Sequence, residues 1–166
     1  MLVAPLAGGL SDKLGNKPFM MLGLVLQGAG LLWLGLEATP EVGYGSLVLP
    51  LIVAGIGISM VFPTVANAVV GSVPITDSGV AAGTNNTVRE LGGVFGVAIL
   101  AAVFAARGGY SSPAAFMHGF RSAEIVAAAV AIAGAGVAAL APTRGQLTVA
   151  HPPEVPLAAM PQPHEG

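Results

Sequence analysis

The feature that most constrains this chain is a series of long apolar segments that contain few or no charged side chains. Segments 18–36 and 46–72 carry no charge at all, and 78–106 and 122–141 are almost as apolar. A helix needs roughly 20 mostly apolar residues to cross the hydrocarbon core of a bilayer. Each segment is therefore predicted to form one membrane-spanning helix, which makes the fold an all-α membrane protein.

The overall composition supports lipid as the solvent. Charged residues make up 8% of the chain, against about 25% in soluble domains, and the mean hydropathy is +0.81. The net charge of −2 provides no basic surface for nucleic acid, and the absence of cysteine excludes thiolate metal sites. No cluster of nucleophilic or acid–base residues suggests an enzyme.

The two ends of the chain differ from this pattern. Residues 1–10 are apolar but too few to cross a membrane, so they are predicted to be the end of a truncated membrane helix. Residues 142–166 are rich in proline and are predicted to be a disordered tail. His151 and His164 in this tail are not expected to bind a metal.

A glycine-bracketed polar turn joins the first ten residues to the first predicted span. Its residues fit the pattern G-x-L-[SA]-D-[RK]-x-G-[RK]-[RK], with Asn16 in place of one base. The turn resembles the loop signature of the major facilitator superfamily of secondary transporters. The matching residues are Gly8, Leu10, Ser11, Asp12, Lys13, Gly15 and Lys17.

Later segments resemble the drug:proton antiporters of that superfamily, which have fourteen spanning helices. The matches are Gly55-Ile-Gly57, Phe62-Pro63, Phe116-x-x-Gly119-Phe120 and, most extensively, Gly79-x-Ala81-x-Gly83-x-x-Asn86-Thr87-x-Arg89-x-x-Gly92-Gly93-x-x-Gly96.

The resemblance implies that the four spans are the last four of fourteen, a partial C-terminal half of the bundle. It also implies a proton-coupled multidrug exporter of lipophilic compounds, without a cofactor. Such a fragment would need the missing N-terminal half to transport.

The resemblance suggests a role for the turn at 11–17. Its carboxylate, Asp12, is expected to contact a helix of the missing half and to latch one conformation, with the turn glycines allowing close approach. The alternative is that Asp12, Lys13 and Lys17 are solvated loop charges that only set the topology.

A second candidate site lies inside the third span, at Asn86, Arg89 and Glu90. A helix over 78–106 would be about 43 Å long, about 13 Å more than the hydrocarbon core. If the excess lies at the cytoplasmic end, Arg89 lies just inside the membrane. It is predicted to dock the other half or to line the transport path; snorkelling to the interface is the alternative.

Other polar and proline residues within the spans are weaker candidates. Gln27 and Asn67 could line a path or hydrogen-bond to a neighbouring helix. Pro50 and Pro63 are predicted to kink the second span. Glu124, at the start of the fourth span, is expected near the outer interface. Small residues at a spacing of four, as in Gly79/Gly83, Gly92/Gly96 and Gly55/Ser59, are expected to pack helices together.

Charge asymmetry suggests an orientation. Lys13 and Lys17 favour a cytoplasmic position for the turn, and the next loop contains acids but no base. Four spans then return the tail to the cytoplasmic side of the plasma membrane. Two alternatives to the exporter fragment stay open: a small transporter that works as an oligomer, and a non-transporting membrane assembly subunit.

Overall fold

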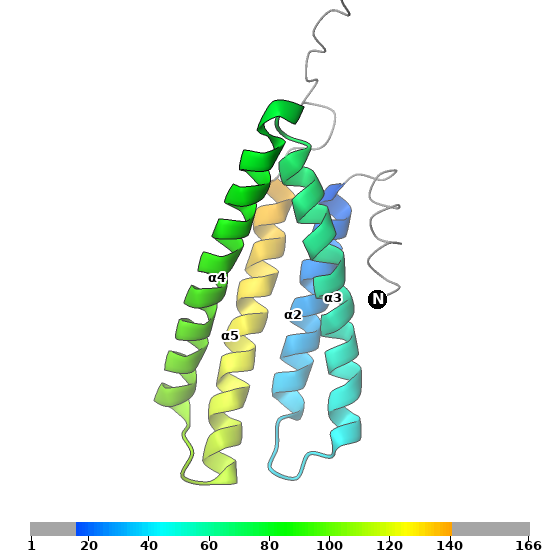
Figure 1. Cartoon of the computed structure of the whole chain (residues 1–166). Coiled ribbons are helices and arrows are strands. Elements are labelled where there is room, and N and C mark those ends of the chain that lie inside the picture. The colour runs from blue at the N-terminus through cyan, green and yellow to red at the C-terminus, as the bar shows by residue number, and fades with distance from the viewer. Residues whose placement is uncertain (1–15, 141–166) are drawn as a thin grey trace, which may run out of the picture.

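The computed structural model describes residues 16–140, which form four long helices (Figure 1). They are α2 (Asn16–Glu37), α3 (Tyr44–Val70), α4 (Ser78–Arg107) and α5 (Pro113–Leu140), with a short 3-10 helix, η1 (Ile75–Asp77), before α4. Each long helix is long and apolar enough to cross a membrane. The described residues contain no strand, so the predicted all-α class is confirmed. The predictions for 1–10 and 142–166 lie outside the described residues.

The start of α5 differs most from the sequence prediction. The helix begins at Pro113, nine residues before the predicted start at Ser122. The Ser112 hydroxyl oxygen accepts a hydrogen bond from the Ala115 backbone N–H at 3.1 Å, which is an N-cap, and proline fits the first turn. Arg121, just outside the predicted span, is therefore inside the helix.

The start of α2 also differs. Asn16 and Lys17, predicted to belong to the polar turn, form the first turn of α2. Pro18 follows in the same turn, where its missing N–H leaves no intrahelical bond unmade. Helix α2 therefore includes the last two residues of the predicted turn.

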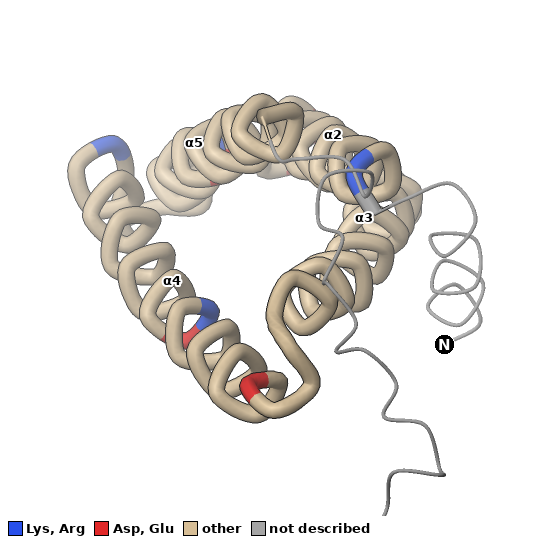
Figure 2. The backbone as a smooth tube through the Cα atoms, turned by 90° about the horizontal axis from the view of Figure 1, so that it is seen from above, with Lys and Arg blue, Asp and Glu red and all other residues tan. Residues whose placement is uncertain are grey.

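Helix α2 lies between α3 and α5 and packs closely against both (Figure 2). Its contact with α3 depends on Gly57, where an added Cβ atom would lie 2.5 Å from the Gly23 carbonyl oxygen and would also collide with the Gln27 backbone nitrogen. A Cβ at Gly30 would lie 2.8 Å from the Pro50 carbonyl oxygen. Without side chains at these positions the two backbones approach closely, as is typical of helices in lipid.

The contact between α2 and α5 has the same character. A Cβ at Gly28 would lie 2.7 Å from Cγ1 of Ile132 and 3.2 Å from the Ala128 carbonyl oxygen. Ala128 is 1% exposed, and small buried residues continue along α5 at Ala135 and Ala138. Three helices thus form a packed layer in which glycine and alanine allow close contact.

Helix α4 is different, because none of its residues is buried. It meets α3 next to η1 and α5 at its other end, and Figure 1 shows it leaning away from α3 along its length. Within residues 16–140 no atom lies within 4 Å of a Cβ added at any of its glycines, Gly79, Gly83, Gly92, Gly93 and Gly96. The small-residue pairs predicted to pack α4 are therefore open in this part of the chain.

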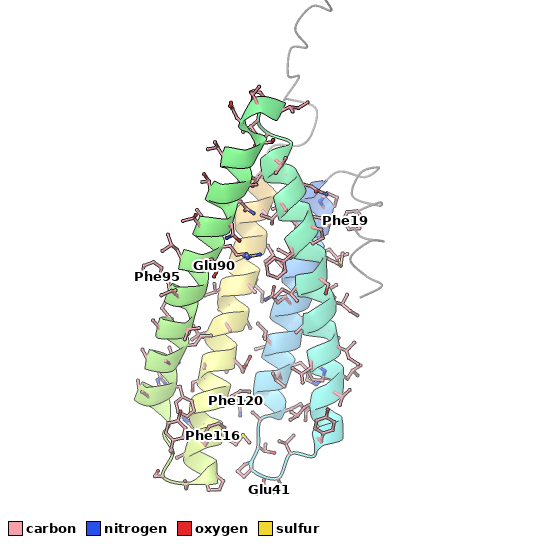
Figure 3. The ribbon with its side chains drawn as sticks, viewed as in Figure 1. Phe19, Glu41, Glu90, Phe95, Phe116 and Phe120 are labelled. Atoms are coloured by element: carbon pink, nitrogen blue, oxygen red, sulfur yellow. The ribbon has the colours of Figure 1, made fainter. Side chains whose placement is uncertain are left out.

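The corner between α4 and α5 is tightly built. An added Cβ at Gly108 would collide with the Ala115 carbonyl oxygen, and one at Gly119 would lie 2.8 Å from the Phe104 ring. Phe104 also contacts Tyr110 and Phe116, with ring centroids 5.2 and 5.3 Å away. Figure 3 shows Phe116 and Phe120 at this end of α5. The corner fixes one end of α4 against α5.

Two glycines of α3 provide a matched test of the packing. We expect Gly57→Ala to lower the free energy of unfolding by about 1–3 kcal/mol, because its methyl group overpacks the α2 contact. Gly55→Ala, at an open position of the same helix, should change it by no more than about 1 kcal/mol, in the stabilising direction. Unfolding in detergent micelles, followed by circular dichroism, measures both. Equal losses of unfolding free energy in the two variants would contradict the close contact of Gly57 with α2.

Candidate functional site

Arg89 is the centre of a polar cluster on α4. One terminal nitrogen of its guanidinium donates to the Asn86 side-chain oxygen at 2.8 Å and to the Glu90 carboxylate at 3.1 Å. Although Arg89 and Glu90 are adjacent in sequence and point about 100° apart around the helix, the long arginine side chain reaches across this angle. The structure therefore brings together all three residues predicted for this site.

The cluster faces α3 through an aromatic contact. The Arg89 guanidinium carbon lies 5.6 Å from the centroid of the Phe62 ring, within the range of a cation–π interaction. Sequence reasoning did not pair Phe62 with Arg89. The pairing could have been predicted, because Phe62 and Arg89 lie at similar distances along the chain from the short connection between α3 and α4. Residues so placed in a helix hairpin lie at similar levels along its axis.

The cluster lies inside a membrane-spanning segment yet is open. The side chains of Arg89 and Glu90 are 53% and 69% exposed, and Arg89 lies roughly 16 Å along α4 from its start. Charged groups within a membrane are costly against lipid and usually face protein or water. The exposed part of this pair is therefore expected to face protein or water, or to reach the interface by snorkelling.

Gln27 and Asn67 occupy different positions. Gln27 is half-buried on α2, and its backbone forms the contact with Gly57. Asn67 is exposed in the last turn of α3, where its carbonyl oxygen accepts a hydrogen bond from the Gly71 backbone N–H at 2.9 Å. Between residues 16 and 140, neither side chain forms a hydrogen bond to another helix, so the structure does not join them to the Arg89 cluster.

The two prolines lie within one continuous helix, α3. Pro50 is almost completely buried and packs against Gly30 of α2. Next to Pro63, the buried Thr64 hydroxyl donates to the carbonyl oxygens of Met60 and Val61, at 2.8 and 2.9 Å. Such bonds from a side chain to the preceding turn often accompany bends in helices.

Glu124 is not at the start of its helix, as the sequence had suggested, but well inside α5. Its Cβ would lie 3.0 Å from a Cβ added at Gly35, close to the end of α2. At the same end, the Trp33 indole N–H donates to the Glu37 carboxylate at 3.4 Å, and tryptophan is common at membrane interfaces. The longer α5 thus leaves Glu124 level with the end of α2.

The predicted latch residues Gly8, Asp12, Lys13 and Gly15 lie outside the described residues. Lys17 lies in the first turn of α2 and is half-buried. In the described part of the chain, no group of three or more histidine, cysteine, aspartate or glutamate side chains could hold a metal ion.

Comparison with known proteins identifies the family. The sequence pattern of the Major Facilitator Superfamily matches residues 1–160. The chain belongs to the major facilitator superfamily. It is thus an integral membrane protein of a transporter family rather than an enzyme, and its four helices are consistent with part of a major facilitator bundle.

Three members of the superfamily are similar in sequence. The Cephamycin export protein CmcT of Amycolatopsis lactamdurans is 32% identical over 134 residues, which are 80% of this chain and 26% of that protein. The Uncharacterized MFS-type transporter YcnB of Bacillus subtilis (strain 168) is 27% identical over 142 residues, 80% of this chain and 29% of that one. The Multidrug transporter protein MdtP of the same organism is 31% identical over 112 residues, which are 66% of this chain and 20% of that protein.

The chain therefore spans less than a third of the length of these major facilitator relatives. No solved structure gives a significant match.

A double-mutant cycle tests the contact between α3 and α4. We expect Phe62→Leu and Arg89→Gln to be coupled by about 0.5–1 kcal/mol in the free energy of unfolding, as for cation–π pairs at exposed sites. Phe95→Leu is the matched control, because Figure 3 shows Phe95 on the side of α4 away from α3. The effects of Phe95→Leu and Arg89→Gln on the free energy of unfolding should add without coupling. Coupling of the same size in both cycles would contradict a specific Phe62–Arg89 contact.

Proposed function

We propose that this chain forms part of a secondary-active multidrug exporter that uses the proton gradient to expel lipophilic compounds. The support comes from the family and from two relatives, one named as a cephamycin export protein and one as a multidrug transporter protein. The motifs at 8–17 and 79–96 also resemble those of fourteen-helix drug:proton antiporters. We place the chain in the plasma membrane, with the turn at 11–17 and the tail in the cytoplasm.

The observation that carries the proposal is the open surface of α4. It has no buried residue, its glycines face open space, and its central charged pair is more than half exposed. A helix with small residues is suited to close contact with another helix in lipid. We propose that further helices of the transporter, from its N-terminal half, pack against α4.

In this arrangement Arg89 has the role of a docking residue. Phe62 and Asn86 hold its guanidinium, whereas its exposed side and Glu90 remain available to polar groups of the other half. Arginine suits such a contact because its planar group presents several donors in a fixed geometry. A place on the transport path is the alternative role, and Gln27 and Asn67 are secondary candidates for lining that path.

The transport proposal can be tested with a chimera. Residues 1–140 of this chain would replace the matching segment of the multidrug transporter protein of Bacillus subtilis. We expect the chimera to extrude a fluorescent lipophilic dye from cells, and this chain alone to extrude none above an empty vector. Extrusion by the chain alone would instead support a small oligomeric transporter. A chimera that is inserted and stable but inactive would contradict the exporter proposal.

Within the active chimera, Arg89 can be tested by two substitutions. Arg89→Gln removes charge-assisted hydrogen bonds of about 1.5–3 kcal/mol, so we expect the dye efflux rate to fall about tenfold or more. Arg89→Lys keeps the charge but not the planar donor geometry. Its efflux rate should lie between those of the unsubstituted chimera and Arg89→Gln. Docking also predicts that Arg89→Gln weakens crosslinking between α4 and the first half. Unchanged efflux and crosslinking would contradict both proposed roles.

The proposed latch makes a separate prediction. In the same chimera, Asp12→Asn should shift the balance between inward-open and outward-open states about tenfold, because one charge-assisted contact is lost. Single cysteines introduced into the cytoplasmic cavity, labelled in inside-out vesicles with a membrane-impermeant reagent, measure this shift. Glu41→Gln, the same change in the loop after α2, is the control and should have no effect. The same accessibility in both variants would mean that Asp12 is only a solvated loop charge.

A further inference from the structure

A hollow in the described part of the chain lies between α4 and α5, close to their connecting corner. It has a volume of about 340 Å³ and is lined by Val103, Ala106, Arg107, Ser122, Ile125 and Val126. On each helix the lining residues are spaced by three and four positions, so each helix contributes one face. The hollow is thus a groove between two helices that separate just beyond the tight Gly108–Gly119 contact.

The groove changes in polarity along its length. Arg107, the last residue of α4, is the polar lining residue nearest the corner, and Ser122 adds a hydroxyl about one turn further along, near the level of Val103. Val103 and the two apolar residues of α5, Ile125 and Val126, provide the apolar part. Since the helix ends lie near the membrane surface, a cation lies at the level of the lipid headgroups and apolar side chains lie at the level of the acyl chains.

The charges around the groove favour an anion. In residues 16–140 the one ion pair joins Arg89 to Glu90, so no described carboxylate neutralises Arg107. Glu124 is close in sequence to Ser122, but it is on the face of α5 that packs against Gly35 of α2. The Ser122 hydroxyl donates to the His118 carbonyl oxygen at 2.9 Å, which leaves its oxygen free to accept a hydrogen bond.

We propose that this groove binds an anionic glycerophospholipid of the surrounding bilayer, with the phosphate on Arg107 and an acyl chain along Val103, Ile125 and Val126. Arginine binds phosphate through paired hydrogen bonds. A headgroup with a hydroxyl, such as phosphatidylglycerol, can also donate to Ser122. The proposal does not depend on the transport function, because it concerns the α4–α5 corner and not the Arg89 cluster.

Native mass spectrometry of the intact chain tests the proposal. The chain would be purified in detergent with an equimolar mixture of phosphatidylglycerol and phosphatidylcholine. We expect it to retain phosphatidylglycerol in preference, and Arg107→Gln to lower this retention about tenfold, the effect of losing charge-assisted hydrogen bonds. Arg107→Lys should retain an intermediate amount, and Arg121→Gln, the same change outside the groove, should keep the preference.

A second pair of variants tests the apolar part. Val126→Trp fills the groove and should reduce retention of the lipid, whereas Val137→Trp, on an exposed part of the same helix, should not. Helix content by circular dichroism confirms that each variant is folded. Equal retention of the two lipids, or equal effects of the Arg107 and Arg121 substitutions, would overturn the proposal. Loss of the lipid in the chimera would also overturn it, since protein would then fill the groove.

Discussion

The close approach of α2 to its two neighbours is the contact on which the rest of the structure depends. In lipid there is little hydrophobic gain from bringing two apolar helices together, so association relies on van der Waals contact. The contact with α3 uses Gly57 and Gly30, and the contact with α5 uses Gly28. Because these positions have no side chain, three helices form a packed layer, and the surfaces outside it can serve other purposes.

This arrangement divides the chain into two parts with different roles. The packed helices α2, α3 and α5 supply a scaffold, whereas α4 is held by η1 and by the corner with α5 and buries none of its residues. The polar cluster lies where the two parts meet, since Phe62 belongs to the scaffold and Arg89 to α4. A charge is thus placed where the chain has the least internal packing.

The sequence predicted the number and type of the helices well, because four apolar segments leave no other fold compatible with lipid. It also grouped Asn86, Arg89 and Glu90, since all three lie within little more than one helical turn. The start of α5 was predicted too late because the apolar run begins only after Arg121, while a serine cap and a proline begin the helix earlier. The partner of each glycine could not be predicted, because Gly55 and Gly57 have the same local sequence character and differ only in which side of the helix meets α2.

The attachment of α4 at its two ends has a consequence for what the rest of the helix can carry. Its position is set by η1 and by the Gly108–Gly119 corner, and it buries no residue between them. A helix held in this way can keep a charged pair half-way along its length, whereas a helix packed on all sides would have to bury that pair at a high desolvation cost.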